Sequence, residues 1–337
     1  MKAVAYQQSL PIDQADALVD VSLPDPIAED RDVLVEVRAV SVNPVDVKKR
    51  AGSKPAVGEW NVLGWDAAGV VRAVGPDVKM FKPGDRVWYA GSITRPGSNS
   101  ELQLVDERIV GMMPSSLDFA AAAALPLTSL TAWEMLFDRF SIPQDVTADG
   151  KSLLIIGAAG GVGSIMTQLA RRLTGLTVIG TASRPETQDW VLQAGAHHVI
   201  DHTQPFAPQL EHIGIPTPDY VVSLTHSDQH FDQIADVIAP QGKFGLIDDP
   251  DFFDVRKLKR KSVSLHWELM FTRSMFNTED MVRQHHILTE IATLVDSGVL
   301  RSTVADHFGQ INAENLKRAH ALIESGKSRG KIVLENF

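Results

Sequence analysis

Residues 152–164 read SLLIIGAAGGVGS and decide the fold of the segment around them. Their first part, SLLIIGA at 152–158, is continuously apolar, which is typical of a strand that a parallel sheet buries on both faces. A glycine-rich loop follows, and VGSIMTQLARRLTG at 162–175 then has the apolar spacing expected of a helix. The stretch therefore predicts a buried strand, a tight loop and a helix in direct succession.

The same alternation repeats towards the C-terminus. Further apolar runs have the pattern of strands, namely TVIGTAS (177–183), HHVID (197–201), DYVVSLT (219–225), GKFGLID (242–248) and SVSLHWEL (262–269). Helical patterns lie between the runs, among them 185–196 and 230–240. Alternating strands and helices imply right-handed crossovers, and hence a parallel, doubly wound sheet. This segment is predicted to be an α/β domain.

Small residues take three defined places in the glycine-rich loop. The dinucleotide-binding fingerprint needs one for a tight turn, one for close approach to a pyrophosphate and one for tight packing of the helix. Here Ala158, Gly160 and Gly163 take these places, with Gly161 and Val162 between the last two. The free N–H groups of the helix N-terminus favour the negative charge of phosphates. We therefore predict a Rossmann-type dinucleotide site, the alternative being a tight structural turn.

The end of the second strand indicates which dinucleotide binds. An Asp or Glu about 20 residues after the loop would bond the 2′-hydroxyl of the adenosine ribose and select NAD. This chain has Ser183 and Arg184 instead, and no carboxylate occurs from Thr181 until Glu186. A hydroxyl and a guanidinium suit a 2′-phosphate, so the predicted cofactor is NADPH; Arg184 could instead be an exposed helix-capping charge. His202, after the third strand, either contacts the same phosphate or is an ordinary surface histidine.

The regions on either side of this domain have a different pattern. Alternating branched apolar and polar residues, with Gly-Pro and Pro-Gly turns, predict short strands at 33–42, 67–75 and 82–90. Helix formers fill 117–137, which Pro126 divides into two pieces, and a strong helical pattern covers 279–297. From residue 300 to 337 the chain returns to short strands. The flanking regions therefore predict an irregular β-rich domain.

Composition excludes several classes of protein. The length of 337 residues allows two domains. A net charge of −10 and a pI near 5.5 argue against binding nucleic acid or an anionic membrane surface, which usually require a basic excess. The absence of cysteine excludes disulfides and thiolate metal sites. Because the N-terminus lacks a secretory apolar region and no long apolar run occurs, we expect a cytoplasmic protein without a membrane span.

Several separated motifs occur in the order found in one known superfamily. They are SVNPVDVKKR (41–50), LGWDAAGVVRAVG (63–75), FKPGDRVW (81–88), LPLTSLTAWE (125–134), GAAGGVG (157–163) and GKSRGKIVL (326–334). Over nearly its full length the chain resembles the medium-chain dehydrogenase/reductase superfamily, and most of all its zinc-independent quinone oxidoreductase branch, including bacterial proteins named "zinc-type alcohol dehydrogenase-like". The resemblance implies a GroES-like catalytic domain from residues 1–122 and 276–337, a Rossmann domain at 123–275, a cofactor cleft between them and a homodimer.

The chain departs from the zinc-dependent members of that superfamily. Those members hold a catalytic zinc ion with a Cys, a His and a second Cys, and the matching positions here are Asn43, Trp65 and Leu127. None of these is a credible ligand, since zinc prefers thiolate, imidazole or carboxylate. Asp46 and Asp66 lie nearby, yet two carboxylates without a His or Cys make a poor site. No metal is predicted, and Trp65 is expected to make this wall of the cleft apolar.

The absence of residues that could bind zinc at these positions changes the expected chemistry. Without a Lewis acid to stabilise an alkoxide, oxidation of simple alcohols is disfavoured. Quinones and α,β-unsaturated carbonyls accept a hydride without a metal if their carbonyl oxygen receives a hydrogen bond. We therefore expect NADPH-dependent reduction of a small-molecule quinone or enone. Two alternatives stay open: a zinc-dependent alcohol dehydrogenase, and a protein that binds NADPH without catalysing a reaction.

The resemblance implies roles for individual residues. Asn43 would lie at the nicotinamide end of the cleft, where its amide could donate to the substrate carbonyl; the alternative is an Asx turn with Pro44. No residue stands out as the proton donor, but Tyr89 is the best placed by motif. The expected cofactor contacts, beyond loop residues Ala158, Gly160, Gly161, Val162 and Gly163, are Asn43, Thr131, Ser183, Arg184, His202, Leu224, Leu246, Ile247 and Lys331.

Asp66 lies in the apolar stretch VLGWDAAGVV (62–71). An isolated buried charge is costly, so a carboxylate in such surroundings is either paired or functional. We expect it to be paired with Lys331 or Arg329, holding the C-terminal strand, rather than to act in catalysis. Lys331 could otherwise approach the cofactor phosphates.

Overall fold

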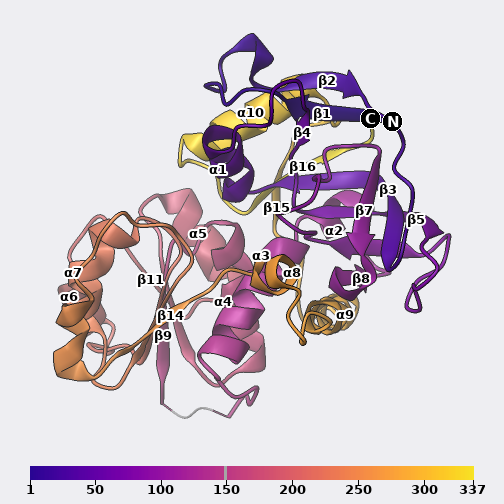
Figure 1. The fold of residues 1–337 in the computed structure, drawn as a ribbon. Coiled ribbons are helices and arrows are strands. Elements are labelled where there is room, and N and C mark those ends of the chain that lie inside the picture. Colours follow the sequence, from indigo (N-terminus) through magenta and orange to yellow (C-terminus); the bar gives the residue numbers. More distant parts are fainter. Residues whose placement is uncertain (148–149) are drawn as a thin grey trace. The chain divides into compact units, whose positions relative to one another are not determined.

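Figure 1 shows the computed structural model of the chain, which describes residues 1–147 and 150–337. These residues divide into two compact units. The terminal unit consists of Met1–Leu130 and Phe271–Phe337, and the inner unit of Thr131–Met270. The division falls a few residues from the limits expected from the sequence, 122/123 and 275/276, which remain a prediction.

The inner unit is built on a parallel sheet. Among the described residues this sheet has six strands, β9 (Ser152–Ile156), β10 (Thr177–Thr181), β11 (His198–Ile200), β12 (Tyr220–Ser223), β13 (Lys243–Leu246) and β14 (Ser264–Trp267). Their order is β11-β10-β9-β12-β13-β14, and all neighbours pair in parallel. β9 is central, because Leu154 pairs with Ile179 of β10 and with Val221 of β12. The predicted doubly wound α/β topology is confirmed.

Helices connect these strands and cover the sheet (Figure 1). They are α4 (Gly161–Leu173), α5 (Pro185–Ala194), α6 (Phe206–His212), α7 (Ser227–Val237) and the 3₁₀ helix Val255–Lys261. One apolar cluster joins the strands to α6 and α7, with Leu154, Val221, Phe231 and Phe244 almost without exposure. The central strands β9 and β12 are buried along their whole length, as their apolar runs predicted, whereas the edge strands β11 and β14 are partly exposed.

The terminal unit is a β-rich domain that both ends of the chain form. Its strands are β1 (Lys2–Tyr6), β2 (Val19–Ser22), β3 (Asp32–Val42), β4 (Asn61–Val62), β5 (Ala67–Val74), β6 (Arg86–Tyr89), β7 (Leu102–Asp106), β8 (Val110–Met112), β15 (Val304–His307) and β16 (Lys331–Glu335). In the larger sheet the order is β15-β16-β3-β5-β6-β8, with β7 also paired to β3. Since β16 pairs with β3 antiparallel, the C-terminal strand completes the N-terminal sheet. This matches the architecture that the resemblance implied.

The apolar segment 117–137 forms two helices, as predicted. They are α2 (Phe119–Ala123) and α3 (Pro126–Trp133), and a π-helical turn, Glu134–Arg139, continues the second. By length and composition Phe119–Arg139 could cross a membrane, with 21 residues and a mean hydropathy of 1.2. However, 89% of its most apolar window is buried inside the protein, which is the pattern of a core helix.

Some helices of the terminal unit were not expected. They are the 3₁₀ turns Ala15–Ala17 and Glu107–Ile109, α1 (Pro44–Gly52), α8 (Thr272–Phe276) and α10 (Ala313–Glu324), whereas α9 (Arg283–Asp296) confirms the predicted helix. After residue 300, β15 and β16 confirm the predicted short strands, but α10 lies between them and was not predicted. The side chain of Asn312 accepts a hydrogen bond from the Asn315 amide, so Asn312 caps the N-terminus of α10. Leu316 and Ala319 then form its buried face.

Candidate functional site

The glycine-rich loop of the inner unit makes a tight turn between β9 and α4. Gly157 adopts a φ of +80°, and its amide donates to the Thr181 hydroxyl of β10 at 3.1 Å. The Gly160 amide donates to the Gly157 carbonyl at 3.1 Å, which closes the turn. α4 starts at the next residue, Gly161. The positive φ falls on Gly157, where a side chain would be strained, so the turn begins one residue before the position assigned to it.

Two other positions of the loop have the roles that the fingerprint predicts. A Cβ on Gly163 would lie 2.5 Å from both Ala158 Cα and the Gly157 oxygen, so only glycine lets α4 pack so closely on the loop. A Cβ on Gly160 would approach only the Gly157 oxygen, at 3.5 Å, so the space in front of Gly160 is open. Gly163 therefore serves packing, and Gly160 leaves room for a ligand to approach the backbone.

The N-terminus of α4 has free donors for an anion. Its N-cap, Gly160, provides no side-chain hydrogen bond, and the first intrahelical bond of the helix runs from the Ser164 amide to the Gly160 carbonyl. The amides of residues 161–163 precede it and have no helical acceptor. Since α4 is 13 residues long, its dipole adds positive potential at this end. These residues fit the pyrophosphate of a dinucleotide.

The predicted phosphate-selecting residues lie close together after the strands. Ser183 and Arg184 follow β10 and are half-buried, and Arg184 Nε lies 3.3 Å from Glu186 Oε1. Burial lowers the pKa of His202 below its usual value, and the positive charge of Arg184 contributes to that shift. The structure thus brings Arg184 and His202 within electrostatic reach of each other. Their predicted contact with a 2′-phosphate stays a prediction.

The apolar candidates of the inner unit differ in exposure. Leu246 ends β13 and belongs to the apolar core, with no exposed surface. Leu224 and Ile247, which follow β12 and β13, are half-buried. Thr131 lies in α3 and is 5% exposed. Leu224 and Ile247 are therefore the more accessible candidates for lining a bound nucleotide.

In the terminal unit, Asn43, Asp66, Leu127 and Lys331 form one buried network. Lys331 Nζ donates to Asp66 Oδ2 and to the Val42 carbonyl, both at 3.0 Å, and to Asn43 Oδ1 at 2.5 Å. Asn43 Nδ2 donates to Asp66 Oδ2 at 3.1 Å, and the Leu127 amide donates to Asp66 Oδ1 at 3.0 Å. The predicted pairing of Asp66 with Lys331 is confirmed. It ties the C-terminal strand β16 to the start of β5.

Asp46 adds a second buried carboxylate beside this network. Asn43 is the N-cap of α1, and its amide donates to Asp46 Oδ2 at 2.7 Å, as in half of a capping box. Burial raises the pKa of Asp46 to about 7, and burial also raises the pKa of Asp66, although Lys331 opposes that shift. Two carboxylates therefore share one ammonium group, which favours the presence of a proton on one of them.

The network leaves no ligand set for catalytic zinc. Asn43 Oδ1 accepts from Lys331, Trp65 Nε1 donates to the Ser92 carbonyl at 3.1 Å, and Leu127 offers only an alkyl side chain. The edge of Trp65 instead packs on the ring of Phe271, with 6.4 Å between centroids. Within residues 1–147 and 150–337, no group of three His, Cys, Asp or Glu side chains has the arrangement of a metal site. The residues present do not fit the zinc ion that the superfamily often binds.

The two catalytic candidates are both buried. Asn43 is 1% exposed and both of its amide hydrogens are engaged, since Nδ2 also donates to the Ser41 carbonyl at 3.3 Å. Tyr89, on β6, has no exposed surface, and burial raises its pKa. In the described part of the chain its hydroxyl has no hydrogen-bond partner. Donation by Asn43 to a substrate would require an Nδ2 bond to open, and both catalytic roles remain predictions.

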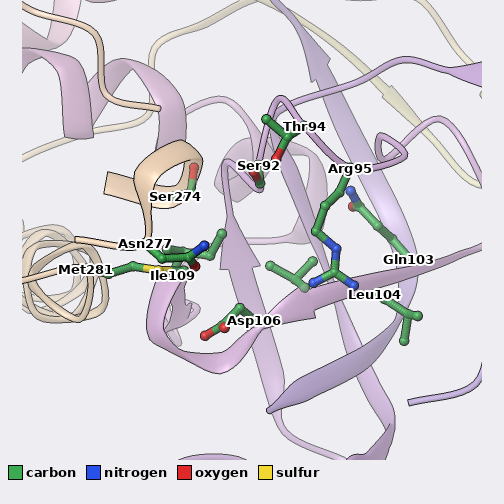
Figure 2. Close-up of a pocket in the computed structure, with 11 residues that line it drawn as sticks. Ser92, Thr94, Arg95, Gln103, Leu104, Asp106, Ile109, Ser274, Asn277 and Met281 are labelled. Atoms are coloured by element: carbon green, nitrogen blue, oxygen red, sulfur yellow. Dashed lines mark hydrogen bonds between the residues drawn. The ribbon is translucent and has the colours of Figure 1, made fainter. Parts of the chain in front are cut away.

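A small cavity of about 120 Å³, lined by both polar and apolar side chains, lies elsewhere in the terminal unit (Figure 2). Ser92 and Arg95 line it from the loop after β6, Gln103 from β7, and Asn277 from the segment after α8. Arg95 is not free to bind an anion, because its guanidinium holds the Asp32 carboxylate through two hydrogen bonds of 2.7 and 2.8 Å. None of the predicted site residues lines this cavity.

Comparison with known proteins identifies the family. A model of the GroES-like domain of alcohol dehydrogenases matches residues 29–122, and a model of zinc-binding dehydrogenases matches residues 194–334. A "zinc-type alcohol dehydrogenase-like protein" of Staphylococcus aureus (strain MSSA476) is 39% identical over 336 residues, 99% of each chain. Human quinone oxidoreductase is 38% identical over 182 residues, which are 53% of this chain and 52% of the human protein.

Solved structures are similar along the whole chain, and one of them shares more than half of its residues with this protein. It is a crystal structure from Rhizobium etli CFN 42, provisionally described as a zinc-dependent alcohol dehydrogenase. It has 56% sequence identity and a TM-score of 0.95, and the match covers 100% of this chain and 98% of that one. On this similarity from end to end, the protein belongs to the medium-chain dehydrogenase/reductase superfamily of oxidoreductases.

Proposed function

We propose that the protein is an NADPH-dependent, zinc-independent reductase of quinones or other α,β-unsaturated carbonyl compounds. One observation carries this proposal: the positions that hold catalytic zinc in other members are Asn43, Trp65 and Leu127, which hydrogen-bond or pack within the protein and offer no ligand set. A reaction that depends on a Lewis acid is therefore disfavoured. The similarity to human quinone oxidoreductase supports a conjugated carbonyl as the hydride acceptor.

The inner unit would hold the nucleotide. The amides of Gly161, Val162 and Gly163 at the start of α4 would receive the pyrophosphate, and Ser183 and Arg184 the 2′-phosphate. Arg184 offers a planar set of donors suited to phosphate oxygens, and the carboxylate of Glu186 lies beside it. When bound, the nicotinamide ring supplies the hydride, and the protein supplies binding and orientation.

The buried network of the terminal unit would supply a hydrogen-bond donor, and Asp46 beside it a group that holds a proton. Lys331 donates to Asn43 Oδ1, which polarises the amide and makes its N–H groups stronger donors. If one of these groups turns to a substrate carbonyl, it stabilises the negative charge that grows on that oxygen during hydride transfer. The buried Asp46, whose pKa is raised to about 7, is suited to hold a proton near neutral pH.

The proposal predicts that activity survives metal removal. Protein dialysed against a chelator should reduce members of a quinone and enone panel with NADPH at the rate of untreated protein, because no step needs a metal. Metal analysis should find far less than one zinc ion per chain. Loss of turnover on chelation, with recovery on adding Zn²⁺, would contradict the proposal.

Two rival functions remain distinguishable from this one. A zinc-dependent alcohol dehydrogenase is favoured by the descriptions of the relatives from Staphylococcus and Rhizobium, and it would oxidise simple alcohols only with zinc bound. A non-catalytic protein would bind NADPH but turn over no acceptor in the panel. A homodimer and a cytoplasmic location remain predictions.

A further inference from the structure

Three histidines gather at one edge of the sheet in the inner unit. His202 follows β11, His226 follows β12, and His230 lies in the first turns of α7. The carboxyl ends of parallel strands meet at the same edge, which is also the edge where Arg184 follows β10. The rings of His202 and His230 have their centroids 6.0 Å apart at an angle of 76°. The ring of His230 stacks on Phe206, with 5.7 Å between centroids.

The backbone conformation of His226 supports a role for this edge of the sheet in binding. His226 adopts a left-handed φ of +50° at the start of α7, a conformation that is uncommon for a residue with a side chain. Such strained positions often accompany binding sites. Its ring is exposed, and its Nδ1 lies 2.7 Å from the Thr225 hydroxyl, so the imidazole is held at the edge of the sheet.

In the free protein, the surroundings of His202 favour its neutral form. Burial lowers the pKa of His202, and the charges of His226 and Arg184 lower it further, although Asp201 opposes them. His202 is half-buried, and its Nδ1 has no hydrogen-bond partner in the part of the chain that the structure describes. Without an anion nearby, His202 is therefore mainly neutral at neutral pH.

His230 behaves in the same way. Burial lowers its pKa, and the charges of His202 and His226 lower it further. Asp228 and Asp248 oppose that shift, but the Asp248 carboxylate is already engaged with the Ser227 amide at 2.9 Å and with the Ser227 hydroxyl. The cluster therefore joins several cationic groups that repel one another when protonated. A dianion placed among them would relieve this repulsion.

We propose that His202 and His230 act with Arg184 as a proton-linked site for the 2′-phosphate of NADPH, so that binding this cofactor takes up a proton and the preference over NADH grows as the pH falls. The inference rests on the proposed function, because it assumes that the dinucleotide carries a 2′-phosphate. It goes further by naming the histidines as determinants of cofactor choice and by making that choice depend on pH.

The expected proton uptake follows from the linkage between proton binding and cofactor binding. If binding a ligand takes up one proton, its dissociation constant changes by up to about tenfold per pH unit between the free and bound pKa values. In the free protein the pKa values of His202 and His230 lie below their usual range, and a phosphate dianion within hydrogen-bond distance would raise them. We therefore expect an uptake of about 0.3–1 proton per NADPH near pH 7.

Isothermal titration calorimetry of the wild-type protein tests this directly. NADPH and NADH are titrated at about pH 7.5 in buffers with different ionisation enthalpies, which yields the number of protons exchanged. The phosphate of the ligand has a pKa of about 6 and would release protons on binding to a cationic site, so a net uptake must come from the protein. Uptake with NADPH and none with NADH is the expected result.

Histidine variants test whether the proton taken up with NADPH binds to this cluster. His202→Asn and His230→Asn should each reduce the uptake and weaken NADPH binding, while the affinity for NADH stays the same. His212→Asn is the matched control, because His212 is exposed at the C-terminal end of α6 and should leave the uptake unchanged. If a variant fails to fold, imidazole resonances of the wild-type protein with and without NADPH report the same pKa change by NMR.

The outcomes separate the inference from the proposed function. If NADPH binds more tightly than NADH at every pH and without proton uptake, the inference is wrong while the proposed function stands. If NADPH and NADH bind equally well, the NADPH dependence itself is wrong. If uptake occurs but the His212 variant loses it as well, the proton does not belong to this cluster and the inference is again overturned.

Discussion

Replacing Lys331 by methionine is expected to lower the free energy of unfolding by about 3–5 kcal/mol, because Asp66 would remain buried without its counterion. Lys331 and Asp66 are 3% and 0% exposed, and 3.0 Å separates Lys331 Nζ from Asp66 Oδ2. Methionine retains much of the apolar stem of lysine. The lost free energy of unfolding therefore measures the contribution of the ammonium group rather than the cost of a cavity. Urea denaturation at neutral pH measures the change.

Comparison variants make this prediction specific. Asp66→Asn should lower the free energy of unfolding by less than Lys331→Met does, since Lys331 keeps the Val42 carbonyl and Asn43 Oδ1 as acceptors. The same variant should affect stability more than cofactor preference. The double variant should lose less free energy of unfolding than the two single variants lose together, because the two side chains interact. Lys82→Met, at an exposed position, should stay within about 0.5 kcal/mol of wild type.

Two outcomes would contradict this account of Asp66. A loss from Lys331→Met no larger than that from Lys82→Met would mean that the buried pair does not hold β16 to the sheet. An Asp66→Asn variant with an unchanged melting temperature but without turnover would assign Asp66 to catalysis instead.

Replacing Arg184 by alanine is expected to raise the dissociation constant of NADPH by about 10–100-fold, which corresponds to about 1.4–2.8 kcal/mol. The guanidinium would donate charge-assisted hydrogen bonds to the 2′-phosphate, and NADH has no such group. The affinity for NADH should therefore stay within about twofold of the wild-type value. Calorimetric titration with both nucleotides measures the two constants.

Arg172→Ala provides the matched control for this variant. Arg172 is exposed in the last turn of α4, at the opposite end of the helix from the glycine-rich loop. This substitution removes one positive charge from the inner unit, as Arg184→Ala does, but it should leave the NADPH preference intact. Equal binding of NADPH and NADH by wild-type protein, unchanged in Arg184→Ala, would refute the role given to Arg184.

The fold was predictable where the sequence pattern has one physical reading. Runs such as 152–158 and 219–225 are mainly apolar because a central parallel strand is buried on both faces, and all such runs became strands of one sheet. The amphipathic helix α10 was missed, although Asn312 and the buried Leu316 and Ala319 carried its signal. Its charged residues alternate with short apolar groups, a pattern that resembles strands over a short window.

The candidate site was predictable only in part. The pairing of Asp66 with Lys331 followed from the cost of an isolated buried charge, but the place of Asn43 in the same network did not, because it joins residues 288 positions apart. The hydrogen bonds of an amide depend on such long-range contacts. For the same reason the sequence alone did not indicate that His230 packs against His202.

Transfer of deuterium from NADPH labelled on its nicotinamide C4 tests the central claim most directly. Metal-stripped protein is incubated with the labelled cofactor and a panel of enones, and mass spectrometry and NMR locate the label in the product. The account predicts deuterium on the β-carbon of the reduced enone, in the same yield with and without added Zn²⁺. Absence of the label unless Zn²⁺ is present would contradict it.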